Sequence, residues 1–77
     1  MSYHTTQKQF TFLETKQYAS IIPDTGATVT VEFSNGNGWV EDPESPISGP
    51  VKIFAQSNTV RLTPSGGGYH VDEGSAL

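Results

Sequence analysis

The sequence predicts an all-β protein: a small antiparallel β-sandwich or barrel of six to seven short strands in a meander-like order. The first observation is segment 27–39, ATVTVEFSNGNGW, where apolar and polar residues alternate before a turn rich in Asn and Gly. The second is a series of strand-like segments at roughly ten-residue spacing, separated by turn residues. No stretch has the periodicity of a long helix. We therefore expect one β domain over residues 1–77.

The composition limits both the core and the partners. Hydrophobic residues make up 34% of the chain, with 8 Gly and 5 Pro, so the core is thin and an oligomer or a larger partner would help to stabilise it. Cysteine is absent, which excludes disulfides and thiolate chemistry. A net charge of -4 with four basic residues argues against nucleic acid as a partner. We expect no signal peptide and no membrane-spanning segment, because no apolar run is long enough.

Two segments near the N-terminus predict the first hairpin. Residues 9–13 and 18–22 both alternate, and a turn at 15–16 would place Phe10 opposite Ile21. The same pairing sets Phe12 opposite Ala19, so that one face stays apolar. The polar residues 1–7 are expected to form a flexible arm or an edge extension.

The turn after the strand at 28–34 determines where Trp39 points. A two-residue loop at 35–36 would pair Glu32 with Trp39 and place the indole on the polar face. A three-residue loop at 35–37 would pair Phe33 with Trp39 and place it in the core. We favour the core, because a lone Trp in a small domain more often packs than recognises a ligand.

The segments on either side of this strand are expected to be turns and loops. Pro23 followed by Asp24-Thr25-Gly26 predicts a type I turn. Segment 41–50 holds three prolines and three acids, and is expected to form an exposed loop, either a functional projection or an arm that contacts a neighbour.

The C-terminal half predicts two more hairpins. A turn at 57–58 would place Ile53 opposite Leu62 on the inner face and Phe54 opposite Arg61 on the outer face. Ala55 would then face Val60. A turn at Gly66-Gly67 would place Leu62 opposite Val71 and Arg61 opposite Asp72, with Tyr69 and Val71 pointing inward. Residues 73–77 are expected to fray.

One motif suggests an enzyme. Asp24-Thr25-Gly26-Ala27 matches the catalytic loop of retroviral-type aspartic proteases, in which two carboxylates across a dimer share a proton. Pro23 stands where that family has an apolar strand residue, no later segment matches its second signature, and the chain is short. A simple turn before a strand explains the motif better, so we expect no enzyme and no catalytic residue.

The other polar residues do not indicate a metal or cofactor site. His4 and His70 lack a partner at ligand spacing, and surface or turn positions explain them better. Glu41, Asp42 and Glu44 lack the regular spacing of a calcium loop. The Gly66-Gly67-Gly68 run is followed by no helix that could bind a phosphate, so no cofactor is expected.

The outer face of the C-terminal hairpin is the predicted contact surface, because aromatic residues and Arg are typical interface anchors. A solvent-facing sheet that merely tolerates Phe54 is the alternative. With the neighbouring loop, the candidate interface residues are Phe54, Arg61, Lys52, Trp39, Glu44 and Ile47.

Two segments resemble a known group of proteins. Residues 28–39, TVTVEFSNGNGW, and 60–69, VRLTPSGGGY, are similar to the hairpin and late strand of small β-rich structural proteins of tailed bacteriophages. The resemblance covers about half of the chain. It implies a head-decoration, neck, or tail and fibre-attachment component, made in the host cytoplasm and placed in the virion.

The predicted function is therefore that of a non-enzymatic structural or assembly protein of a phage particle. Its partners would be other copies of itself, with a trimer favoured, and other virion proteins. The alternative is a module that binds carbohydrate or protein, in which Trp39 and Tyr69 would serve as exposed stacking platforms. The third class is the dimeric aspartic protease.

Overall fold

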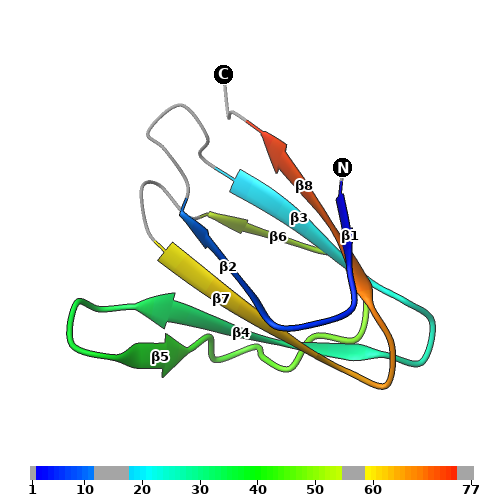
Figure 1. Cartoon of the computed structure of the whole chain (residues 1–77), viewed down its shortest axis with the longest axis horizontal. Coiled ribbons are helices and arrows are strands. Elements are labelled where there is room, and N and C mark those ends of the chain that lie inside the picture. Colours follow the sequence, from blue (N-terminus) through cyan, green and yellow to red (C-terminus); the bar gives the residue numbers. More distant parts are fainter. Residues whose placement is uncertain (1, 12–17, 55–58, 75–77) are drawn as a thin grey trace.

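The part of the chain that the structure describes forms eight β-strands in two antiparallel sheets, as expected for a small β-sandwich (Figure 1). The computed structural model describes residues 2–11, 18–54 and 59–74, with residues 54, 73 and 74 through their backbone alone. The strands are β1 (Ser2–His4), β2 (Lys8–Thr11), β3 (Tyr18–Pro23), β4 (Thr28–Ser34), β5 (Trp39–Glu41), β6 (Val51–Phe54), β7 (Thr59–Ser65) and β8 (Tyr69–Gly74).

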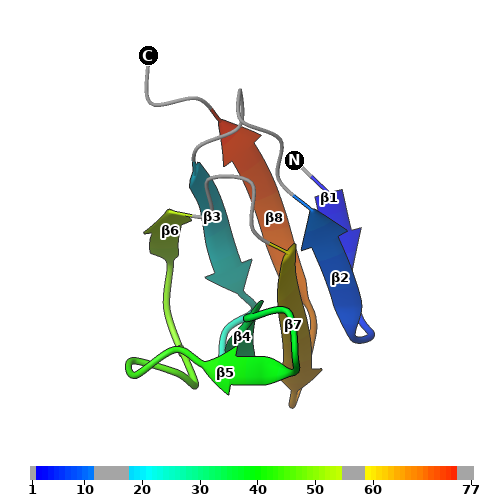
Figure 2. The same cartoon turned by 90° about the vertical axis from the view of Figure 1, so that its left-hand side faces the viewer.

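The chain changes sheet at almost every connection. The first sheet has the order β1-β8-β3-β6 and the second sheet the order β2-β7-β4-β5. Only β4 and β5 are both consecutive in sequence and adjacent in a sheet. Figure 2 shows β1 and β2 together at one side of the molecule and β6 at the other. The sandwich is confirmed, but the meander-like order is wrong.

Three predicted hairpins are wrong for the same reason. β2 pairs with β7 rather than β3, so Phe10 lies opposite Val60. β6 pairs with β3, and β8 lies between β1 and β3. Strands that face each other across a sandwich bury alternate residues just as hairpin strands do, so the pattern alone does not identify the neighbour. The predicted turns at 15–16 and 57–58, with Phe12 and Ala55, lie outside the described residues.

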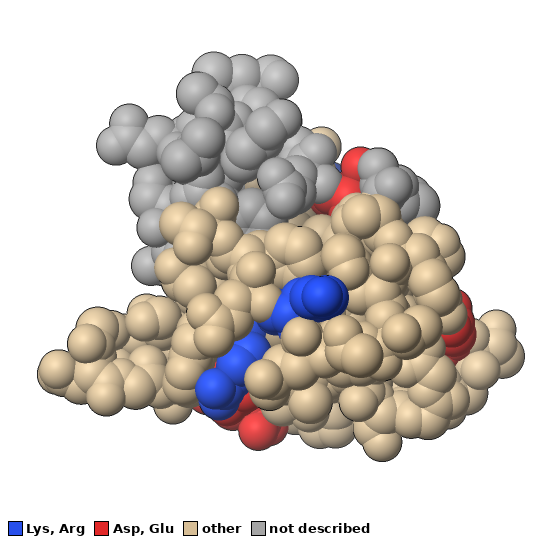
Figure 3. Space-filling model, in the orientation of Figure 1, with Lys and Arg blue, Asp and Glu red and all other residues tan. Residues whose placement is uncertain are grey.

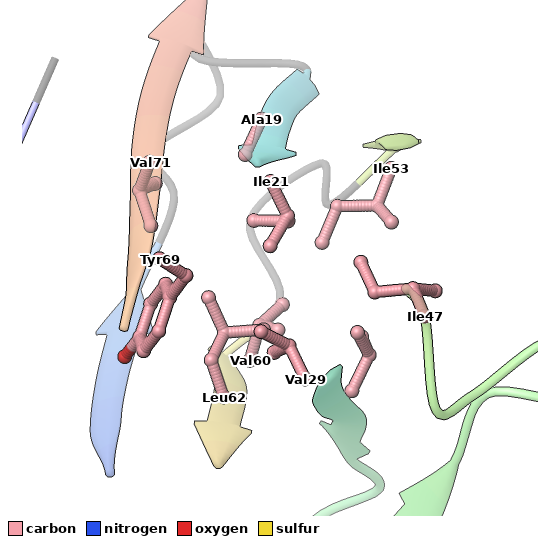
Figure 4. Packing of buried hydrophobic residues seen from close by; sticks show 10 residues of the cluster. Ala19, Ile21, Val29, Ile47, Ile53, Val60, Leu62, Tyr69 and Val71 are labelled. Atoms are coloured by element: carbon pink, nitrogen blue, oxygen red, sulfur yellow. The ribbon is translucent and has the colours of Figure 1, made fainter. Parts of the chain in front are cut away.

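The inward faces of both sheets build one apolar core (Figure 4). From the first sheet, Ile21 and Val71 point toward residues such as Val29 and Leu62 of the second sheet, and these side chains are at most 3% exposed. Among the described residues, the inward positions predicted from the alternation are therefore correct even where the pairing is not. The buried cluster consists of Ala19, Ile21, Val29, Val31, Ile47, Ile53, Val60, Leu62, Tyr69 and Val71.

Tyr69 is the largest side chain of the core and is fully buried. Its hydroxyl donates a 3.1 Å hydrogen bond to the carbonyl of Thr6, in the segment that joins β1 to β2. Burial raises the pKa of this phenol to about 12, because the charged form would lose its hydration. The predicted role of Tyr69 as an exposed stacking platform is therefore wrong.

Segment 42–47 covers the edge of β4 that β5 leaves open. Val29 exchanges two 2.9 Å backbone hydrogen bonds with Ile47. The Val31 carbonyl accepts a hydrogen bond from the Asp42 amide, and the Val31 amide donates one to the Ser45 hydroxyl, each at 2.8 Å. This part of the loop thus satisfies backbone groups that an uncovered strand would expose.

Ile47 is part of the core, which corrects its place among the candidate interface residues. Its side chain is 6% exposed and packs in the buried cluster. The loop was expected to be fully exposed because it is rich in proline and acids, but a single apolar residue is enough to anchor it. Glu44, in contrast, is exposed.

The ends of the chain also differ from the expectation. Ser2–His4 form the edge strand β1, paired with β8, so the edge extension is correct and the flexible arm is not. Residues 73 and 74, expected to fray, belong to β8 and pair with β3. Residues 75–77 lie outside the described residues.

A single copy buries as much surface as an ordinary monomer. Its accessible surface is 4539 Å², and a monomeric protein of 8.3 kDa is expected to have about 4,600 Å². One chain therefore buries about as much surface as a monomer of this mass, although Val40 on the inner side of β5 remains 52% exposed.

We expect Ile47→Ala to lower the free energy of unfolding by about 2–5 kcal/mol, because it leaves a cavity between the sheets. Ile47→Val, which removes one methylene, should cost about 0.5–1.5 kcal/mol. The exposed neighbour Ser48 provides the control, since Ser48→Ala should change stability by about 0.5 kcal/mol or less. Urea denaturation measures all three. If Ile47→Ala behaved like Ser48→Ala, segment 42–47 would not be anchored in the core.

Candidate functional site

Three side chains form a cluster on the outer face of the second sheet. Arg61 on β7 donates from Nε and Nη2 to the two carboxylate oxygens of Glu32 on β4, at 3.0 and 3.1 Å. The Arg61 guanidinium also lies over the indole of Trp39 on β5, 4.4 Å from the ring centroid. We call Glu32, Arg61 and Trp39 the Trp39 cluster. Because Arg61 is held on two sides, its planar group is fixed before any partner arrives.

The position of Trp39 corrects the core placement. The β4–β5 connection has four residues, 35–38, and pairs Ser34 with Trp39. Ser34 alternates with the inward-facing Phe33, so Trp39 lies on the outer face, where it is half-buried. The loop closes because the Asn35 side chain accepts backbone hydrogen bonds from Asn37 and Gly38. Both shorter loops considered from the sequence are therefore wrong.

Acidic side chains continue along the same row of the sheet. Glu32 lies between Arg61 on β7 and Glu41 on β5 in the pairing register. The exposed Glu41 forms no ion pair with the described residues. In Figure 3, acidic and basic atoms touch each other near the β4–β5 end of the molecule, and most of the visible surface carries no charge.

The structure divides the rest of the predicted contact face between two sheets. Lys52 lies on β6 in the first sheet, exposed, with its Nζ 4.4 Å from the ring centroid of Tyr18. Phe54 lies opposite Tyr18 in the backbone register and not opposite Arg61. The predicted pairing of Phe54 with Arg61 across a hairpin is therefore wrong, and the Phe54 side chain lies outside the described atoms.

A second cluster joins the Asp24 turn to the glycine-rich turn. The Asp24 carboxylate accepts hydrogen bonds from the Tyr3 hydroxyl at 2.5 Å and from the Gly68 amide at 3.0 Å. The Asp24 amide donates to the Gly68 carbonyl at 2.9 Å. One residue thus connects β1, the β3–β4 turn and the start of β8. The turn itself is closed by the Ala27 amide, which donates to the Asp24 carbonyl.

Gly68 has no space for a side chain at this junction. A Cβ built on Gly68 would lie 2.5 Å from the Tyr3 hydroxyl and 2.6 Å from the His4 carbonyl. Any other residue would therefore displace β1 from Asp24. The sequence analysis identified both turns but missed that they contact each other, because no local pattern indicates a contact between residues 44 positions apart.

These hydrogen bonds set the charge state of Asp24. The Tyr3 hydroxyl and then the Gly68 amide lower the pKa of Asp24, because both donors favour the charged carboxylate. The hydrogen bond between Tyr3 and Asp24 also raises the pKa of Tyr3. Within one chain, the Asp24 carboxylate is therefore an acceptor that holds β1 and the glycine-rich turn together.

The two histidines lie beside aromatic rings. His4 packs edge-on against Phe10, with ring centroids 5.3 Å apart, and His70 lies 4.7 Å from the ring of Tyr3. Over residues 2–11, 18–54 and 59–74, no group of three His, Asp or Glu side chains is placed to hold a metal ion.

Comparisons with protein-family models, curated proteins and solved structures found no match for this chain. The described segments include no helix long and apolar enough to cross a membrane.

We expect Asp24→Asn to destabilise the fold at pH 7 and to remove part of its acid sensitivity. Because the folded-state pKa of Asp24 is lowered, the stability it contributes is present above the unfolded pKa of about 4 and is lost as the pH falls through the folded value. The difference in urea midpoint between the wild type and Asp24→Asn should therefore begin to shrink near pH 4 and disappear as the pH falls through the folded-state pKa.

Tyr3→Phe removes the main donor to Asp24 and serves as the partner variant. The effects of Asp24→Asn and Tyr3→Phe should not add in the double variant at pH 7, since both break one hydrogen bond. A constant difference between wild type and Asp24→Asn from pH 7 to pH 3 would contradict this assignment.

Proposed function

We propose that this protein is a non-catalytic structural or assembly protein that acts through oligomeric and partner contacts, as in the phage particles whose small β-rich components it resembles. The observation that carries the proposal is the Trp39 cluster on the outer face of the second sheet. Trp and Arg are the residue types most enriched among those that dominate binding energy at interfaces.

The geometry of the cluster suits a contact surface. Glu32 and indole stacking hold Arg61, so less side-chain freedom is lost when a partner binds. The Arg61 and Glu32 side chains are 24% and 21% exposed, so the ion pair is partly buried in the outer face but still open to a partner. A fixed Trp-Arg pair of this kind can serve as an interface anchor.

The other supports are the fold and the surface. The buried cluster is formed by residues of one chain, so the outer faces can make assembly contacts. Lys52 on the first sheet and Glu44 beside β5 are further exposed charged residues that such contacts would use.

A carbohydrate-binding module is the second candidate. The outward position of Trp39 favours it, because an aromatic ring on an open sheet face can stack on a sugar. Arg61 already covers one side of the indole, and Tyr69 is buried. Titration with a glycan panel tests this candidate: unchanged Trp39 fluorescence across the panel would dismiss it.

We expect light scattering across a concentration series to give a stable multiple of the 8.3 kDa chain mass. Trp39→Ala should shift dissociation of this oligomer to about tenfold higher concentration or more, because loss of an interface anchor costs about 2 kcal/mol. Thr28→Ala, at the other end of β4, should leave the mass unchanged.

Circular dichroism confirms that both variants are folded before their masses are compared. A native mass of 8.3 kDa at every concentration would overturn the oligomer proposal. Equal dissociation of Trp39→Ala and Thr28→Ala would show that the oligomer forms through another surface.

A further inference from the structure

The edge strand β5 has backbone groups that no described strand pairs with. The Asn35 amide bonds the Gly38 carbonyl and the Asp42 amide bonds the Val31 carbonyl, which fixes the hydrogen-bonding pattern between β4 and β5. In this antiparallel pattern the backbone of Val40 points to β4, and the N–H and C=O groups of Trp39 and Glu41 point to the open side.

The inner side of this edge is apolar and uncovered. Val40 lies opposite Phe33 on the side of the sheet that faces the core, yet it is 52% exposed. Figure 1 shows why, since the β4–β5 turn reaches past the ends of the other described strands. An added strand would therefore gain hydrogen bonds from Trp39 and Glu41 and apolar contact with Val40.

The charge of the edge indicates which strand fits. Glu41 faces outward beside Glu32, whose carboxylate is occupied by Arg61, and Asp42 and Glu44 follow directly. The other three edge strands, β1, β2 and β6, contain no carboxylate. A strand with Lys or Arg beside Glu41 would supply the ion-pair partner that Glu41 lacks among the described residues. Pairing β5 with β5 of a second copy would instead bring two acidic edges together.

We propose that β5 binds an extended basic segment of a partner protein, which adds to the second sheet as a fifth strand. The segment has Lys or Arg at alternate positions, facing Glu41, and an apolar residue between them that covers Val40. This inference rests on the proposed assembly function and names the chemical class of the partner.

The probe for this site is a fluorescein-labelled peptide of alternating Lys and Val. Its control carries an N-methyl group on every backbone amide, which keeps the charge but removes the amide donors that strand addition needs. Anisotropy should show binding of the Lys/Val peptide at least tenfold tighter than of the control peptide. Amide chemical shifts of Trp39 and Glu41 should move on titration. Equal affinity for the two peptides, or shifts confined to other residues, would overturn the proposal.

Matched variants separate the edge from general charge attraction. Glu41→Gln and Asp72→Asn each remove one negative charge, but Asp72 lies on β8 in the first sheet. Glu41→Gln should weaken peptide binding several-fold and Asp72→Asn should not. Glu41→Pro removes the amide donor at the open edge without removing a hydrogen bond to β4, and should abolish strand addition. Equal losses for Glu41→Gln and Asp72→Asn would overturn the proposal.

The two proposals can fail separately. If the chain forms an oligomer but does not bind the Lys/Val peptide, the assembly function stands and the proposed β5 site is rejected. If Glu41→Lys also dissociated that oligomer, the occupant of the edge would be a second copy of this chain, which overturns the basic-partner inference. If the chain is strictly monomeric but binds the peptide at Trp39 and Glu41, the β5 site stands and the oligomer proposal is rejected.

Discussion

Burial of alternate side chains in one core shared by two sheets is the constraint on which the rest of this structure depends. Six of the eight described strands contribute side chains to it, all except β1 and β5, and residues such as Ile21 and Leu62 are fully buried from opposite sheets. Because the core occupies the inward positions of β4 and β7, the charged side chains of Glu32 and Arg61 lie on the outer face of the second sheet. The Trp39 cluster and the open β5 edge both follow from this division.

The sequence predicted the faces of the strands better than their neighbours. Alternation identified Val29, Val31, Tyr69 and Val71 as inward, because that pattern depends only on the strand geometry. Turn residues suggested hairpins, yet the same Gly-rich turn at 66–68 carries the chain from one sheet to the other. Pairing depends on contacts between distant segments, and these have no local signature.

The site shows the same limit. Trp39 and Arg61 were both identified as candidate anchors. Their contact depends on a four-residue loop, whereas the sequence analysis considered only loops of two or three residues. Ile47 was assigned to the surface because its neighbours are proline and acids, whereas its bridge to Val29 places it in the core. In each case the residue type indicated a role, but the sequence did not show which residue it contacts.

The pairing of β1 with β8 sets the order in which the protein can form on the ribosome. β8 lies between β1 and β3, so the first sheet has no continuous strand order until residues 69–74 have been synthesised. Until then β1 and β3 lack the strand that lies between them, and contacts between such distant segments form slowly. We therefore expect the first sheet to be completed only after β8 has been synthesised, and the apolar segments to be prone to aggregation until then.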